Sequence, residues 1–183
     1  MTFIIFCDAS IKAYGSYVYI CQGNQSRLVM AKNRVAPMKQ LTLPQLELMA
    51  AVIGAQLASH VQSSLDISEC DTIFWTDSQI VLYWLTSTKP LKHFVANRVK
   101  EIHNVTKPQA FRFCPTYDNP ADLLTRGISA DQFNRNTLWM NGPHWLIDTD
   151  KWPNWKRNNP DTITLSTLAD QTVNDHSQCR PND

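Results

Sequence analysis

A change of hydrophobic period near residue 40 is the feature that most constrains how this chain can fold. Before it, three runs rich in β-branched and aromatic residues, 2–9, 14–21 and 27–35, are separated only by short turns, which predicts an antiparallel meander of three strands. After it, apolar residues recur at helical spacing from Leu46 to Val61, which predicts a long helix. A chain that changes period in this way is expected to fold as an α/β domain.

A capping box marks the beginning of this helix. Thr42 can accept a hydrogen bond from the backbone of Gln45, the Gln45 side chain can reach back, and Pro44 is tolerated in the first turn. Further on we expect a strand, two helices, a strand and a short helix, at 72–76, 78–85, 94–105, 110–115 and 120–126. The order βββ-α-β-α-α-β-α implies a mixed sheet with helices on both faces.

The composition of the chain changes after Gly127, which predicts three parts. Residues 1–127 carry all the expected strands and helices. Residues 128–155 include four of the six tryptophans, and we expect them to form an extension packed on the domain, because exposed tryptophans would leave a large apolar patch. Residues 156–183 are polar with few large apolar side chains, which is typical of a linker or a flexible tail.

Composition excludes several classes of protein. With 43% hydrophobic and 18% charged residues, the chain is neither a coiled coil, nor collagen, nor wholly disordered. We expect no contact with a membrane, because no apolar run reaches the roughly 18 residues of a membrane span, and no signal peptide, because the N-terminus has no basic region. Five scattered cysteines without a CxxC pair argue against a disulfide framework or a structural zinc site and favour a reducing compartment.

The net charge of +1 conceals a segregated pattern. Residues 1–45 and 89–107 each hold five basic residues and one acid, whereas residues 46–88 hold five acids and neither Lys nor Arg. Basic stretches that flank a few isolated carboxylates suit an anionic polymer held over a metal site. Chance scatter over a solvated surface is the alternative that the charge pattern alone leaves open.

Four acidic residues stand where the ends of strands and helices can converge. Asp8 and Asp77 each follow an apolar strand, and sites in open α/β sheets form at the carboxyl ends of parallel strands. Glu47 and Asp122 lie in the first turns of helices. Taken singly, Asp77 could be a helix N-cap and the other two ordinary first-turn acids. Together the four form an all-oxygen ligand set, which favours Mg²⁺ or Mn²⁺ and the hydrolysis of a phosphodiester.

Short segments around these acids carry a more specific pattern than the acids alone. They are 6–10 (FCDAS), 13–15 (AYG), 32–37 (KNRVAP), 41–48 (LTLPQLEL), 75–78 (WTDS), 94–99 (FVANRV) and 118–122 (DNPAD), followed by 138–139, 142–146 and 152–153. In this order they resemble the ribonuclease H segment of BEL/Pao long-terminal-repeat retrotransposon polyproteins. The resemblance covers about residues 3–153.

The resemblance implies an RNase H-like α/β fold, with a mixed five-stranded sheet of order 3-2-1-4-5, helices on both faces, and hydrolysis of RNA in RNA–DNA hybrids during reverse transcription. It implies two Mg²⁺ or Mn²⁺ ions as cofactors. Catalytic and metal-ligand roles are implied for Asp8, Glu47, Asp77 and Asp122. Substrate contacts, including the minor groove and the 2′-hydroxyls that distinguish RNA from DNA, are implied for Ser10, Gly15, Ser78, Gln79 and Arg98.

The resemblance also implies a setting. The expected partners are an RNA–DNA hybrid and neighbouring reverse transcriptase and integrase domains in a Pol polyprotein. The expected location is intracellular, in a cytoplasmic virus-like particle or in the nucleus. The sequence departs from the pattern of other RNases H in two places. The loop 113–118 lacks the His that many cellular RNases H carry there, and the segment 86–92 is too short for the extra basic helix that some of them have.

Two other functions stay open from the sequence. A catalytically inactive RNase H-like module could bind nucleic acid or partners without cleaving, and the chain could serve as a connector between a polymerase and an integrase. The presence of all four carboxylates favours an active enzyme. An aspartic peptidase is rejected, because neither Asp8 nor Asp77 stands in the Asp-Thr/Ser-Gly loop that such an enzyme needs.

Overall fold

The computed structural model describes residues 1–38, 41–67 and 70–154. The expected tail at 156–183 lies outside these residues, as does Trp155. The strands are β1 (Thr2–Ala9), β2 (Ala13–Gln22), β3 (Gln25–Val35), β4 (Asp71–Thr76) and β5 (Phe111–Phe113). The α-helices are α1 (Leu43–Ser64), α2 (Gln79–Thr86), α3 (His93–His103), α4 (Asp122–Arg126), α5 (Ala130–Arg135) and α6 (Thr137–Asn141), and short 3₁₀ turns are η1 (Pro108–Ala110), η2 (Thr116–Asp118) and η3 (Thr149–Lys151).

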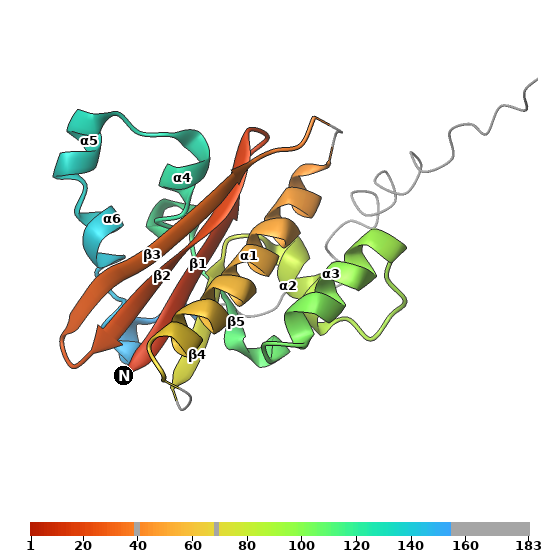
Figure 1. The fold of residues 1–183 in the computed structure, drawn as a ribbon, viewed down its shortest axis with the longest axis horizontal. Coiled ribbons are helices and arrows are strands. Elements are labelled where there is room, and N and C mark those ends of the chain that lie inside the picture. Colours follow the sequence, from red (N-terminus) through yellow and green to blue (C-terminus); the bar gives the residue numbers. More distant parts are fainter. Residues whose placement is uncertain (39–40, 68–69, 155–183) are drawn as a thin grey trace, which may run out of the picture.

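The strands form one sheet in the order β3-β2-β1-β4-β5 (Figure 1). The pairs β1–β2 and β2–β3 are antiparallel, whereas β1–β4 and β4–β5 are parallel. The predicted mixed sheet and its strand order are thereby confirmed. β5 is shorter than the expected 110–115, because Ala110 ends a 3₁₀ turn and Pro115 has no N–H for a strand ladder. Within the described residues no helix is both long and apolar enough to cross a membrane.

One face of the sheet is covered by α1, α2 and α3 (Figure 1). The predicted capping box is present: Thr42 Oγ1 accepts from the Gln45 backbone N–H, and Gln45 Oε1 accepts from the Thr42 N–H at 2.9 Å. Gly54 allows α1 to approach β1 closely, since a Cβ there would lie 2.7 Å from Cys7 Sγ. Glu47, in the first turns of α1, is therefore carried by a helix that is capped and packed tightly on the sheet.

The opposite face of the sheet is covered by α4 and the Trp-rich extension. Trp145 is 3% exposed, and its ring centroid lies 6.1 Å from that of Phe6 and 4.9 Å from that of Trp75. Trp139 and Trp152 pack against the same cluster. Residues beyond 127 therefore bury the second face of the sheet and complete a second hydrophobic core.

We predict that Trp145→Ala lowers the free energy of unfolding by about 3 to 5 kcal/mol, the usual range for removing a buried Trp. The reason is the loss of its contacts with the rings of Phe6 and Trp75. Urea unfolding measures the change. Ile147→Ala, at a side chain that is 42% exposed, is the matched control and should cost well under half as much. A loss below about 1 kcal/mol for Trp145→Ala would contradict the view that the extension completes the core.

Candidate active site

The parallel pairing of β1 with β4 sets the position of two candidate acids. Cys7 pairs in register with Thr76, and Asp8 and Asp77 are the next residues along the two chains. Neighbouring strands lie about 4.8 Å apart, so the backbones of these two residues lie side by side at the C-terminal ends of β1 and β4. Asp8 is 5% exposed, and Asp77 is half-buried.

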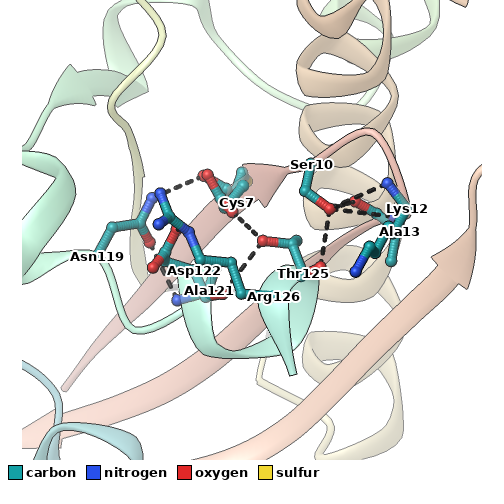
Figure 2. A network of polar contacts seen from close by, with 10 residues as sticks. Cys7, Ser10, Lys12, Ala13, Asn119, Ala121, Asp122, Thr125 and Arg126 are labelled. Atoms are coloured by element: carbon teal, nitrogen blue, oxygen red, sulfur yellow. Dashed lines mark hydrogen bonds and ion pairs between the residues drawn. The ribbon is translucent and has the colours of Figure 1, made fainter. Parts of the chain in front are cut away.

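α4 brings the fourth candidate acid to the end of β1 (Figure 2). Thr125, in this helix, donates its hydroxyl hydrogen to Asp8 Oδ2. Asp122 stands one turn earlier and accepts from Arg126 Nε at 2.7 Å. The link between Thr125 and Asp8 therefore ties the helix that carries Asp122 directly to the first candidate ligand.

Asn119 fixes the approach to α4. Its Nδ2 donates to the Cys7 carbonyl at 3.0 Å, and its Oδ1 accepts from the Ala121 N–H at 3.1 Å (Figure 2). Both ends of this amide are thus used, and the residue is 1% exposed. The loop before α4 is held against the end of β1 by these two bonds.

The third element of the site joins Glu47 to the beginning of α2. Ser78, not Asp77, is the N-cap of α2, since its hydroxyl accepts from the Val81 N–H at 3.3 Å. The N-cap interpretation of Asp77 is therefore wrong, and the Asp77 carboxylate is left for another role. The Ser78 hydroxyl also donates to Glu47 Oε2 at 2.5 Å, so one small side chain both caps a helix and holds a candidate ligand.

Electrostatics couple the four carboxylates. Burial raises the pKa of Asp8 from its ordinary 3.8 to about 7, the Thr125 hydrogen bond opposes this rise, and the charges of Asp77 and Asp122 add to it. Burial likewise raises the pKa of Glu47 from 4.5 to about 7, against the Ser78 hydrogen bond and with the help of the Asp77 charge. The charged form of each of these two acids is thus destabilised by desolvation and by a neighbouring acid.

The oxygen-only donor set fits a hard divalent cation. In the described part of the chain, no three His, Cys, Asp or Glu side chains lie close enough together to share an ion, and hydroxyl or guanidinium donors are bonded to three of the four acids. A buried carboxylate beside other carboxylates that repel it is nevertheless the setting in which Mg²⁺ or Mn²⁺ is favoured, because the cation offsets both desolvation and repulsion.

Two residues with expected substrate contacts, Ser10 and Gly15, also have structural partners within the fold. Ser10 Oγ donates to the Thr125 carbonyl at 2.8 Å and accepts from the Lys12 N–H at 3.1 Å. Gly15 is buried in β2, and a Cβ there would lie 2.4 Å from the Lys32 carbonyl oxygen. Its lack of a side chain is therefore required for the packing of β2 on β3, and contact with substrate stays a prediction for both residues.

The remaining expected substrate residues lie on α2 and α3. Gln79 is the first residue of α2 and is half-buried. Arg98 lies on α3, where its Nε is 3.3 Å from Met49 Sδ and its guanidinium lies 5.3 Å from the centre of the Phe94 ring. Arg98 is also 3.7 Å from Glu101, so its charge is already partly matched within the chain.

Sequence reasoning missed two residues of the site, Thr125 and Asn119. Both act through hydrogen bonds to β1, more than a hundred residues away in the chain. A signal existed for Asn119, because Asn before Pro120 favours a turn. Thr125 carries no such signal, since a Thr in a short helix is ordinary.

Comparison with known families agrees with the resemblance seen in the sequence. Residues 1–78 match the family model described as the Pao retrotransposon-like RNaseH-like domain. The matched segment includes Asp8, Glu47 and Asp77, and ends before Asp122. The resemblance is thereby confirmed over this part of the chain. No curated protein sequence matches the chain.

Solved structures with a similar fold are RNases H. RNase H1 from the halophilic archaeon Halobacterium salinarum matches with a TM-score of 0.52 and 14% identity over 74% of this chain and 100% of its own. LC11-RNase H1 in complex with an RNA/DNA hybrid matches with a TM-score of 0.55 and 14% identity. This match covers 68% of this chain and 94% of the LC11 chain. The N-terminal RNase H domain of a Mycobacterium tuberculosis protein matches with a TM-score of 0.50 and 14% identity. This match covers 73% of this chain and 94% of that domain's chain. The chain thus has the RNase H-like fold.

We predict that the metal-free protein loses stability as the pH rises from about 4 to about 7. Below this range Asp8 and Glu47 are protonated in both states, whereas within it the unfolded chain releases protons that the folded chain retains. Asp8→Asn should therefore be more stable than wild type at pH 8 in EDTA, with a smaller difference at pH 4. Thermal melts in EDTA measure this.

The control for this prediction is Asp71→Asn, at an exposed acid at the opposite end of β4. It should change the melting temperature little at either pH. Adding Mg²⁺ at pH 8 should stabilise wild type and Asp71→Asn, but Asp8→Asn much less. A pH profile of wild type that coincides with that of Asp8→Asn would contradict the raised pKa.

Proposed function

We propose that the chain is an RNase H that hydrolyses the RNA strand of RNA–DNA hybrids with Mg²⁺ or Mn²⁺ as cofactor. The observation that carries this proposal is that Asp8 and Asp77 lie side by side at the ends of two parallel strands. Glu47 and Asp122 are close enough to interact electrostatically with Asp77 and Asp8, respectively. The RNase H-like fold and the Pao family match of residues 1–78 support it.

The proposed metal ligands are Asp8, Glu47, Asp77 and Asp122. When bound, two divalent ions supply an activated water and stabilise the leaving 3′ oxygen of the phosphodiester. The chain itself orients the acids, since the hydroxyls of Thr125 and Ser78 each hold one carboxylate oxygen. Because these donors are neutral, they orient the acids without cancelling the negative charge that attracts a cation.

Basic side chains suited to a polyanion lie on the strands and the turn beside these acids. Lys12 lies in the β1–β2 turn, and Lys32 and Arg34 lie two residues apart on the edge strand β3, all exposed. In the described part of the chain none of the three forms an ion pair with a carboxylate. Unpaired charges of this kind suit the phosphates of a nucleic acid.

The family match also supports a proposal about the setting of the domain. We propose that the domain works during retrotransposon reverse transcription as a segment of a Pol polyprotein, next to reverse transcriptase and integrase domains. The proposed location is intracellular, in a cytoplasmic virus-like particle or in the nucleus. The retrotransposon family described for residues 1–78 supports this setting.

We predict that the chain cleaves a labelled RNA–DNA hybrid in Mg²⁺ or Mn²⁺, poorly in Ca²⁺, and leaves 5′-phosphate and 3′-hydroxyl ends. Asp77→Asn should keep the fold, because the residue is nearly isosteric and relieves repulsion, yet lose nearly all activity, because an amide is a weak ligand for a hard cation. Gel analysis of the products and circular dichroism of both proteins give the measurements.

The controls separate three outcomes. Asp71→Asn, an equivalent change at an exposed acid, should cleave like wild type. Equal cleavage by wild type and Asp77→Asn would trace the activity to a contaminant or another site and overturn the assignment. Hybrid binding without cleavage in either protein would instead support the inactive binding module.

A further inference from the structure

Thr125 lies where three parts of the structure meet. Its side chain is almost wholly buried, its hydroxyl donates to Asp8 Oδ2, and the same oxygen lies 3.2 Å from the Asp122 carbonyl (Figure 2). A hydroxyl has one hydrogen to donate, so these two acceptors compete. The carboxylate is the stronger acceptor, which favours the bond to Asp8.

Ser10 holds Thr125 from the other side. Its hydroxyl donates to the Thr125 carbonyl at 2.8 Å and accepts from the backbone N–H groups of Lys12 and Ala13 at 3.1 and 3.3 Å. The β1–β2 turn is thereby bonded to α4, as Figure 2 shows. Thr125 is thus bonded through its side chain to Asp8 on β1 and through its carbonyl to Ser10 in the β1–β2 turn.

Two other threonines behave differently. Thr86, the last residue of α2, and Thr106, just beyond the end of α3, direct their hydroxyls to the carbonyl four residues earlier, at 2.9 and 3.0 Å, which is the common local use of a Thr near a helix. Thr125 instead reaches an acid 117 residues away in the chain. With Oδ2 of Asp8 held by this donor, Oδ1 is the oxygen left free of the Thr125 bond.

We propose that Thr125 is a positioning residue that fixes the Asp8 carboxylate through its hydroxyl, and that Ser10 holds Thr125 in place. The part of this inference that concerns catalysis rests on the proposed function, in which Asp8 is a metal ligand. Residues that hydrogen-bond to metal ligands set the direction of the free oxygen, and their loss typically lowers metal affinity or activity by 10- to 100-fold.

The test compares Thr125→Val, which keeps the shape and loses the hydroxyl, with Thr125→Ser, which keeps the hydroxyl. Thr106→Val is the matched control, because it removes only a local bond, from the Thr106 hydroxyl to the Ile102 carbonyl at the end of α3. The first readout needs no metal: the ¹³Cγ NMR signal of Asp8 in EDTA, assigned by its loss in Asp8→Asn. The signal should move in Thr125→Val and stay near the wild-type position in Thr125→Ser and Thr106→Val.

The second readout is a Mn²⁺ titration followed by thermal shift. The midpoint should rise by about 10- to 100-fold in Thr125→Val, and remain close to wild type in Thr125→Ser and Thr106→Val. In hybrid cleavage, Thr125→Val should lower kcat at fixed Mn²⁺ with little change in KM. A merely structural role would lower the melting temperature without this dependence on the metal concentration or the rescue by Ser.

Two outcomes would separate this inference from the proposed function. An unmoved Asp8 signal and an unchanged Mn²⁺ midpoint in Thr125→Val would overturn the positioning role, even if wild type cleaves hybrids. A moved signal with no Mn²⁺ binding by wild type would keep the positioning role and overturn the proposed function. If Thr125→Val does not fold, Ser10→Ala takes its place, and an unmoved Asp8 signal there would overturn the inference.

Discussion

The parallel pairing of β1 with β4 is the constraint on which the site depends. β1 is the central strand, with Phe3 and Ile5 in the core under α1 and Ile4 and Phe6 in the core under the extension. The apolar cover that stabilises the strand also removes water from Asp8 at its end. A carboxylate in that position is costly unless it has donors or a cation. The packing that fixes the position of Asp8 thus also creates its need for partners.

The Trp-rich extension contributes to the site as well as to stability. Trp145 Nε1 donates to Asp118 Oδ2 at 2.9 Å, directly before Asn119, whose amide holds the end of β1. The second core therefore supports the loop that leads into α4. Because rigid support determines how well acids are oriented, a loss of packing in the extension is expected to reach the site through this loop.

The sequence predicts the elements whose signals are local. The period change, the Thr42 capping box and the acids at two strand ends identify the meander, α1 and the candidate site. It does not predict α5, α6 and η3, which are too short to show a helical period. Nor does it predict the bonds of Thr125 and Ser78, because these depend on which distant acids the fold brings close.

Three of the candidate ligands accept a hydrogen bond from another side chain, and the donors are of two kinds. Asp8 and Glu47 are held by neutral hydroxyls, which leave their negative charge intact. Asp122 is paired with Arg126, whose side chain is 68% exposed, and an exposed ion pair contributes only about 0 to 1 kcal/mol. That pair is weak enough to exchange for a cation at little cost. The site therefore combines two acids fixed from within the fold with a third, at its rim, whose partner can be replaced.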